Sequence, residues 1–232
     1  MMQKWGFLWI KDFFHYFFLV IWGPSCIACK SFLLEYVFLC QECTCKINPI
    51  VSYALFVTEK KQVTVFAVSS YKDPLKQLVL AKGFKNRFAA RCLGELMWQK
   101  TAIAYQDFDY IVPIPLHWTR YAWRGYNQAK IMANVIASHS NKPVISFLIR
   151  KRRTAQQSFF TAEGRTLNTQ DAFSLNQRAL KRINVEIPPL TGKRVLLVDD
   201  LMTTGSTAKA AVALLFKAGA ASVSVVVACR VP

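Results

Sequence analysis

The stretch VLLVDDLMTTGST, residues Val195 to Thr207, joins four aliphatic residues, two acids and a hydroxyl-rich loop. Its first four residues predict a strand that is buried on both faces, because they are apolar without alternation. Asp199 and Asp200 come where this strand ends, and a helix is predicted over residues 207–218. This order of strand, loop and helix is typical of an α/β fold that binds its ligand at the carboxyl ends of parallel strands.

The loop between strand and helix suits a phosphate group. Backbone N–H groups at a helix start, helped by the helix dipole, bind a dianionic phosphate, and a glycine permits close approach or a positive φ. The alternative is a helix cap, but a cap needs one hydroxyl residue and this loop has four. The residues expected to hold the phosphate are Thr203, Thr204, Gly205, Ser206 and Thr207.

The two acids cannot serve the phosphate, because their negative charge would repel it. They suit ribose hydroxyl groups, which donate hydrogen bonds to carboxylate oxygens, or a metal ion. The acids and the loop together therefore predict a sugar phosphate as the ligand. Asp199 or Asp200 is also the best available candidate for a general base.

The rest of the chain alternates short apolar runs with helical patterns. That alternation predicts a mostly parallel sheet with right-handed crossovers. At 232 residues and 53% hydrophobic content, the chain has ample material for one folded core. Further strands are expected at 110–114, 144–148 and 222–228, helical segments at 75–97 and 128–138, and a β-hairpin from 51–57 and 63–68.

Basic residues are concentrated between His117 and Arg194, where 14 Lys and Arg stand against three acids in a chain of net charge +17. Such an excess indicates phosphate-rich partners (nucleotides, nucleic acid or anionic membrane) or a merely solvated basic surface. Arginines can bind a polyphosphate bidentately, and a basic loop can contact pyrophosphate or a DNA backbone. The candidate residues are Arg120, Arg124, Arg150, Lys151, Arg152 and Arg153.

Aromatic residues alternate with these cations and allow two interpretations. Stacking on nucleic-acid bases would suit single-stranded DNA, and burial in the core would use the large area of the same side chains. The residues concerned are Trp118, Tyr121, Trp123 and Tyr126.

Four cysteines near the amino end have the spacing C-x₂-C-x₁₀-C-x₂-C. Two such pairs suit a closed, structural Zn²⁺ site, and free or redox-active thiols are the alternative. Cys45 is a spare thiol that could complicate the ligand assignment, while Cys92 and Cys229 are expected in the core. The proposed ligands are Cys26, Cys29, Cys40 and Cys43.

Residues 5–22 are rich in aromatic and aliphatic side chains, but charges interrupt them. The apolar run at residues 13–23, which ends at Gly23-Pro24, is too short to span a bilayer, and a signal-peptide cleavage site is lacking. We expect an amphipathic segment that packs on the domain or lies on a membrane surface. The predicted location is the cytoplasm, with a peripheral association to the inner membrane as the alternative.

The stretch from Val195 to Thr207 resembles the phosphoribosyl pyrophosphate (PRPP) signature of type I phosphoribosyltransferases, at all of its positions. The resemblance implies that the loop holds the 5-phosphate, that the acids contact the ribose hydroxyls, and that Mg²⁺ complexes the pyrophosphate. It also implies a parallel sheet flanked by helices, to which the small zinc-binding segment is added.

Further motifs make the chain similar to the ComF family, phosphoribosyltransferase-like proteins associated with natural competence. That resemblance implies a role in DNA uptake, an amino-terminal four-cysteine zinc motif, and single-stranded DNA or uptake machinery at the inner membrane as partners. The motifs are Pro113-x-Pro115 with Arg120, Arg124-Gly125-Tyr126-Asn127-Gln128, Arg153-Thr154-x-x-Gln157, and Arg165-x-x-Asn168 with Ala172-Phe173.

The expected organisation is a segment 1–47, with the amphipathic stretch and the cysteines, and a phosphoribosyltransferase-like domain 48–232. The domain is divided into a hairpin and helical hood (48–109) and a PRPP-binding core (110–232). Transfer of a phosphoribosyl group to an unidentified acceptor, in DNA uptake, is the leading hypothesis. The alternatives are a phosphoribosyltransferase of nucleotide metabolism or salvage without a DNA role, and a non-catalytic competence factor that binds single-stranded DNA.

Overall fold

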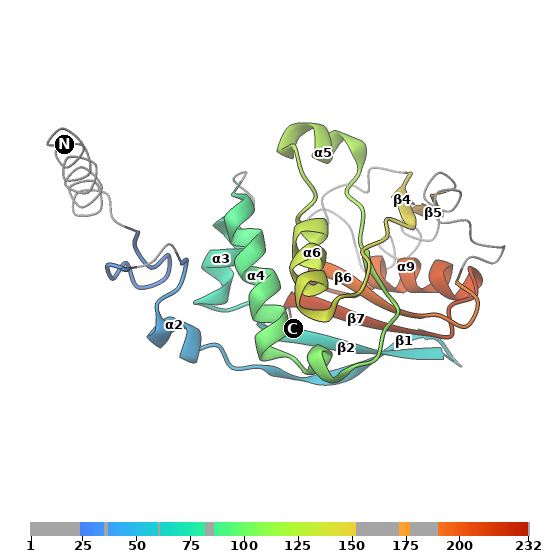
Figure 1. Ribbon diagram of the computed structural model, residues 1–232, viewed down its shortest axis with the longest axis horizontal. Coiled ribbons are helices and arrows are strands. Elements are labelled where there is room, and N and C mark those ends of the chain that lie inside the picture. Colours follow the sequence, from blue (N-terminus) through green and yellow to red (C-terminus); the bar gives the residue numbers. More distant parts are fainter. Residues whose placement is uncertain are drawn as a thin grey trace, which may run out of the picture.

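The computed structural model describes residues 24–34, 37–59, 61–81, 86–151, 172–176 and 190–231. Within them, the central feature is a five-stranded sheet of order β1-β2-β7-β6-β3, in which all strands except β1 are parallel (Figure 1). A small antiparallel sheet pairs β4 with β5. The strands are β1 Ile50–Thr58, β2 Lys61–Ser70, β3 Tyr110–Pro113, β4 Leu148–Arg150, β5 Phe173–Leu175, β6 Arg194–Met202 and β7 Ser222–Arg230.

Helices cover both faces of the central sheet. Alternate side chains of β6 therefore pack into two different cores, one on each face. Leu196 and Val198 pack into a core shared with α3, α4 and α6, whereas Val195 and Leu197 pack into a second core shared with α9. All four side chains are at most 1% exposed, so the predicted strand is indeed buried on both faces. The helices are α2 Gln41–Cys45, α3 Leu75–Ala81, α4 Arg87–Lys100, α5 Trp118–Arg124, α6 Gln128–Ser140 and α9 Ser206–Lys217, with a short 3₁₀ helix at Ala102–Tyr105.

The predicted α/β fold with a mostly parallel sheet is confirmed, and so is the hairpin, which forms β1 and β2. The hairpin joins the central sheet, because β2 pairs with β7 in parallel. The prediction of one strand over 144–148 is wrong. Val144 forms a single parallel bridge with Ile111, and the chain then turns and pairs in the small sheet from Leu148 onward. One apolar run thus contributes to two sheets.

β6 extends beyond its neighbour β3, and this leaves an open edge in the sheet. Residues Tyr110 to Pro113 pair with residues 195–198, and the N–H of Ile114 donates a last hydrogen bond to Val198 O at 2.9 Å. Pro115 has no N–H with which to continue the ladder. Asp199 to Met202 therefore pair with β7 alone. The β3 side of their backbone faces the crevice in which open parallel sheets bind ligands.

The cysteine-containing segment packs onto the helical layer. Buried side chains of residues 26–47, among them Leu33, Leu39 and Ile47, belong to the same core as α3 and α4. The ring of Phe38 lies 5.1 Å from that of Phe88 at the start of α4. The amphipathic segment expected before residue 24 lies outside the described residues. Among the described residues, no helix is long and apolar enough to cross a membrane.

An ion pair connects the segment before β3 to the first residue of β6. Arg194 donates to Asp109 from its backbone N–H at 2.8 Å and from its guanidinium at 3.1 and 3.3 Å. The hydrogen bonds from this guanidinium hold the pKa of the Asp109 carboxyl below its ordinary value of 3.8. The ionised carboxylate is thus favoured in the folded protein, and it helps to align two strands that border the crevice.

Asp109→Asn is expected to lower the free energy of unfolding by about 1–2 kcal/mol at pH 7, because charge-assisted hydrogen bonds are lost. A depressed folded-state pKa stabilises the protein above the unfolded pKa, and this contribution is lost as the pH falls through the folded pKa. The difference in free energy of unfolding between wild type and Asp109→Asn should therefore become smaller below pH 3.8. Urea titrations at several pH values measure it. Asp107→Asn is the control, since that carboxylate pairs with the same arginine but is 89% exposed. An equal effect of both substitutions would contradict the prediction.

Candidate functional site: a cavity at the ends of β3 and β6

A cavity of about 370 Å³ lies at the carboxyl ends of β3 and β6. The loop after β3, the starts of α6 and α9, and β4 all contribute to its walls, so it collects residues from distant parts of the chain. Its lining residues are Ile114, Pro115, Leu116, Arg124, Asn127, Gln128, Ala129, Arg150, Asp199, Asp200, Leu201, Met202, Thr203, Gly205, Ser206, Thr207 and Ala208.

The loop between β6 and α9 forms one wall of the cavity. Gly205 is the N-cap residue of α9 with φ of 73°, and no side chain caps this helix. The contact that comes closest to a side-chain cap is long, at 3.5 Å from Ser206 N to Thr204 Oγ1. A Cβ atom at position 205 would lie only 3.0 Å from Leu55 Cδ1 of β1. The positive φ therefore favours glycine, and a side chain here would also press against Leu55. Without a strong side-chain cap, the N–H groups at the start of α9 suit an anion.

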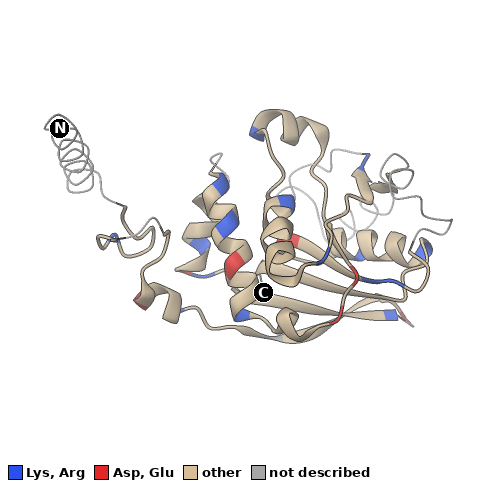
Figure 2. Ribbon diagram, in the orientation of Figure 1, with Lys and Arg blue, Asp and Glu red and all other residues tan. Residues whose placement is uncertain are grey.

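Asp199 and Asp200 lie on the β6 extension that has no β3 partner, and both are half-buried. The Asp200 N–H donates to Asp199 Oδ1 at 2.8 Å, which helps to orient that carboxylate. Acidic residues are few on the described elements, whereas Lys and Arg occur on most of the helices (Figure 2). The donor set, two carboxylates with hard oxygen atoms, suits ribose hydroxyls or Mg²⁺.

The second wall comes from the segment between β3 and α6. Asn127, the N-cap residue of α6, donates from Nδ2 to Ile114 O at 2.9 Å and accepts from Ala129 N at 3.0 Å. It thereby ties the loop after β3 to the start of the helix. Gln128 follows and is only 1% exposed. Asn127 and Gln128 were quoted in the sequence motif but given no role, because nothing in a linear motif shows which side chains reach a cavity.

The predicted basic residues are only partly brought together. Arg124, at the end of α5, and Arg150, at the end of β4, both line the cavity. Arg150 also lies over the ring of Phe173, at 5.5 Å from its centre. Two of the described candidates, Thr204 and Lys151, do not line the cavity, and the Arg120 side chain, Arg152 and Arg153 lie outside the description. Cations from two elements thus share one cavity with the two acids.

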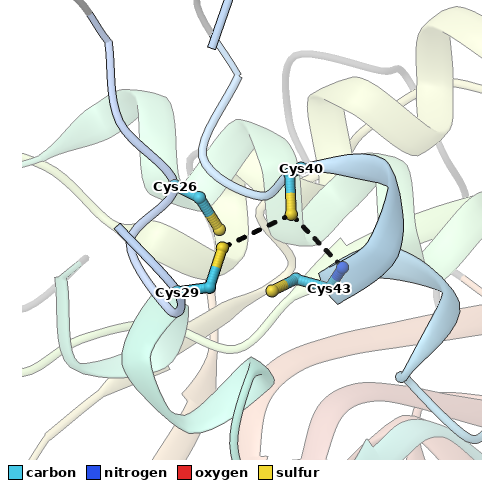
Figure 3. Close-up of side chains that lie close together, drawn as sticks. All are labelled: Cys26, Cys29, Cys40 and Cys43. Carbon is cyan, nitrogen blue, oxygen red and sulfur yellow. Dashed lines mark hydrogen bonds between the residues drawn. The ribbon is translucent and has the colours of Figure 1, made fainter. Parts of the chain in front are cut away.

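The four predicted cysteines converge from two turns of the chain (Figure 3). Cys26, Cys29, Cys40 and Cys43 have sulfur atoms that all lie within 4.8 Å of one another, and Cys29 Sγ is 3.6 Å from Cys40 Sγ. Tetrahedral Zn–S bonds of 2.3 Å require sulfur atoms about 3.8 Å apart, so the cluster fits a tetrahedral metal ion. Cys45 is exposed and is not part of the group.

The thiols of this cluster have contrasting proton affinities. The Ser31 hydroxyl, 3.0 Å from Cys29 Sγ, lowers the pKa of Cys29 to about 6, with a contribution from a backbone hydrogen bond at Ser31. Burial and the neighbouring thiols raise the pKa of Cys43 to about 12. Four thiolates this close repel one another, and a divalent cation removes the repulsion by binding them all. The cluster is therefore a candidate metal site.

The aromatic residues around α5 divide into two groups. Trp118, Tyr121 and Trp123 are 71%, 53% and 65% exposed on this helix, which projects from the body of the molecule (Figure 1). Tyr126 is buried, 6% exposed, with Arg87 over its ring. His117 is also buried, and its ring nitrogen accepts from the backbone of Thr119 as the N-cap of α5. Of the four aromatic residues singled out in the sequence, Tyr126 is therefore a core residue, and the other three are exposed.

Comparisons were made with a family model, with curated relatives and with solved structures. Residues 122–232 match the model of the phosphoribosyl transferase domain. DNA utilization protein YhgH of Salmonella typhimurium is 31% identical over 219 residues, 90% of this chain and 91% of the relative. Competence protein F of Haemophilus influenzae is 28% identical over 209 residues, 87% and 82% of the two chains. The solved structure of the allosteric regulatory enzyme of purine biosynthesis shares 22% identity with a TM-score of 0.40. The match covers 61% of this chain and 25% of that longer one.

Proposed function

Because this chain belongs to the ComF family of competence and DNA utilization proteins and has a type I phosphoribosyltransferase-like fold, we propose that its cavity binds PRPP and that it acts in DNA uptake. The observation that carries the proposal is the distribution of charge in one cavity. Backbone N–H groups of α9, the acids of β6 and the arginines of α5 and β4 all border it.

Each group of PRPP has a matching set of residues. The 5-phosphate takes the loop 203–207, where N–H groups and hydroxyls supply donors at a helix start. The ribose hydroxyls donate to Asp199 and Asp200, which leaves Arg124 and Arg150 for the pyrophosphate. Mg²⁺, held with the pyrophosphate and within reach of the acids, would neutralise part of the ligand's charge. The ligand is thus bound by donors at its two anionic ends and by acceptors at its centre.

The reaction that this arrangement supports is phosphoribosyl transfer. The bond between ribose C1 and the pyrophosphate oxygen breaks, and a nucleophile of the acceptor forms a new bond to C1 and gives up its proton. Arg124 and Arg150 would stabilise the charge of the departing pyrophosphate. Asp199 or Asp200 would accept the proton that the nucleophile loses, either directly or through a water molecule.

The cysteine cluster supports a second part of the proposal, a structural Zn²⁺ ion. Cysteine ligands on every side leave no open position for a substrate. Cys26 and Cys43 are buried in the core shared with α3 and α4, so the ion would hold residues 24–47 against the domain.

Isothermal titration of the zinc-loaded protein with PRPP and Mg²⁺ tests the cavity proposal, and saturable 1:1 binding is expected. A titration without heat, together with no shift of the thermal unfolding midpoint, would sink it. Release of pyrophosphate across a panel of nitrogen-containing acceptors, with and without single-stranded DNA, then tests turnover. Release that depends on one acceptor class identifies the substrate.

Direct binding of single-stranded DNA is a second candidate function, favoured by α5. Its exposed aromatic side chains are available for base stacking, and Arg124 on the same helix supplies positive charge. Net charge of +17 favours association with a polyanion.

Replacing Trp118 and Trp123 together by alanine is expected to weaken binding of a labelled oligothymidine about tenfold in fluorescence anisotropy, because stacking is lost. PRPP binding should weaken less than oligonucleotide binding, since neither tryptophan lines the cavity and the Trp123 ring reaches it only through Arg124, 5.9 Å away. Affinity for the oligonucleotide should also fall steeply with salt. Tyr105→Ala, which removes another exposed aromatic at 90% exposure, is the control. Equal losses in the control and the double variant would argue against α5 as the binding element.

A further inference from the structure

The loop 203–207 rests on two side chains that come from different strands. Gly205, the N-cap residue of α9, is close to both, because a Cβ atom at this position would lie 3.0 Å from Leu55 Cδ1 and 3.7 Å from Met202 Sδ. Leu55 belongs to β1, the edge strand of the central sheet, and Met202 is the last residue of β6. The position of the loop therefore depends on where these two side chains lie.

Tyr53 of β1 fixes the side chain of Met202. Its hydroxyl group donates a hydrogen bond to Met202 Sδ at 3.0 Å. Burial raises the pKa of Tyr53 above its ordinary value of 10, although the positive charge of Arg230 opposes the increase. The hydroxyl therefore keeps its proton at pH 7 and remains a donor. A methionine side chain has several rotatable bonds, so a hydrogen bond to its sulfur atom removes freedom that packing alone would leave.

Arg230, the last residue of β7, holds the Tyr53 ring in turn. Its guanidinium carbon lies 4.0 Å from the centre of the ring, which is a close cation–π contact. The same end of β7 also holds the backbone of Met202, because Met202 pairs with Arg230 and the Val231 N–H donates to Met202 O at 2.8 Å. Met202 is thus connected to the end of β7 twice, directly by its backbone and through Tyr53 by its side chain.

These contacts reach the cavity only through the loop. Met202 and Gly205 line the cavity. The three residues that support them, Tyr53, Leu55 and Arg230, do not. N–H groups at a helix start bind a phosphate well when they point at one place, and α9 begins without a strong side-chain cap that would fix their direction. Among the described residues, the packing behind the loop is therefore what holds these N–H groups in position.

We propose that Tyr53 is a positioning residue: with Arg230 against its ring, it holds Met202 behind the loop 203–207 and thereby aims the N–H groups that bind the 5-phosphate. The inference rests on the proposed function, since it concerns the same ligand. It gives β1 a role in phosphate binding, although this strand precedes residues 122–232, which match the phosphoribosyl transferase domain, and lines no part of the cavity. Loss of Tyr53 should weaken the binding of every ligand that carries a 5-phosphate.

Calorimetry of Tyr53→Ala with PRPP and Mg²⁺, at a temperature where variant and wild type are both folded, tests the inference. Affinity for PRPP should fall about tenfold, because a small displacement of the donors is enough for a loss of this size. Affinity for ribose 5-phosphate should fall by the same factor, within about twofold, since both ligands use the loop. Tyr53→Phe keeps the ring and its cation–π contact and should lose only about threefold, since a thioether sulfur is a weak acceptor.

A double-mutant cycle tests whether Arg230 acts through Tyr53. Arg230→Met alone should weaken PRPP binding about threefold, because the ring loses the cation that holds it. In the Tyr53→Ala background, the same substitution should change the affinity by less than about twofold. Losses that simply multiply would show that Arg230 acts independently of the tyrosine, which contradicts the proposed arrangement.

Phe56→Ala is the matched control. Phe56 lies on the same strand and is 60% exposed, and the alternation of side chains places it on the opposite face of the sheet from Tyr53 and Leu55. This variant should bind both sugar phosphates as wild type does, and a loss equal to that of Tyr53→Ala would contradict the inference.

The remaining outcomes separate this inference from the proposed function. A purely structural role for Tyr53 predicts a lower thermal midpoint, with PRPP affinity of the folded variant within about twofold of wild type. That result overturns the inference alone, and so does a loss confined to PRPP, which would place the effect at the pyrophosphate. Wild-type protein that binds neither sugar phosphate overturns the proposed function itself.

Discussion

The double variant Asp199→Asn/Asp200→Asn is expected to lose at least about a hundredfold in affinity for PRPP, to the point where calorimetry detects no binding. Each carboxylate accepts hydrogen bonds from ribose hydroxyls in the proposed complex, and hydrogen bonds to a charged acceptor contribute about 1.5–3 kcal/mol each. Asparagine keeps the shape but presents only one accepting oxygen and no charge. The measurement is a titration with PRPP and Mg²⁺, supported by pyrophosphate release if the wild-type protein turns over.

The fold of this variant should survive, because both side chains are half-buried at a cavity rather than in the core. Near-equal thermal midpoints of variant and wild type would establish this. Asp107→Asn is the matched control, since it neutralises a carboxylate that is 89% exposed and outside the cavity. It should leave PRPP affinity unchanged. Binding of PRPP by the double variant within about fivefold of wild type would exclude the ribose contacts proposed for these acids.

If the cluster binds zinc as proposed, Cys43→Ser is expected to abolish that binding and to lower the thermal midpoint by about 10 °C. The variant loses one of four thiolate ligands, and a hydroxyl replaces a thiol that is only 3% exposed. The buried residues around the cluster lie in the core with α3 and α4, so loosening them exposes apolar surface. Metal content by mass spectrometry and thermal unfolding check the two parts of the prediction.

Cys45→Ser provides the comparison for this experiment. Cys45 is exposed and two positions away, but it is not part of the sulfur cluster. Its variant should retain one zinc per chain and the wild-type midpoint. Full zinc content in Cys43→Ser would show that the cluster is not the metal site. Wild-type protein that contains no metal and has reactive thiols at Cys26, Cys29, Cys40 and Cys43 would favour the alternative of redox-active cysteines.

Features that are local in the chain were readable in the sequence. Val195 to Thr207 predicted a buried strand, an acid pair and a loop at a helix start, and the strand and the helix are present. The strand continues to Met202, however, so the acids lie within β6 and not after its end, because β7 still pairs with these residues. The four cysteines were equally readable, because two C-x₂-C pairs restrict their own geometry whatever surrounds them. The division of the chain at residues 47 and 109 stays a prediction, as do the roles of individual site residues.

Other features depended on contacts that no local pattern contains. The apolar run at 144–148 has the periodicity of one strand, yet Val144 bridges to β3 while Leu148 pairs with β5. Periodicity reports that a segment is buried but not which partner buries it. The aromatic residues in and just after α5 show the same limit, because Tyr126 is in the core and Trp118 is in solvent.

The sequence by itself determined which groups lie at the end of β6, since the strand, the acids and the hydroxyl-rich loop are continuous and their chemistry is set by neighbours along the chain. Only the tertiary structure decided which other residues line the cavity. Arg124 and Arg150 come from different elements, and β3 ends early enough to leave the β6 extension open. Gln128, a polar residue at the start of α6, is only 1% exposed in the folded protein. Such properties arise from long-range packing, which fixes burial and partners after the chain has folded.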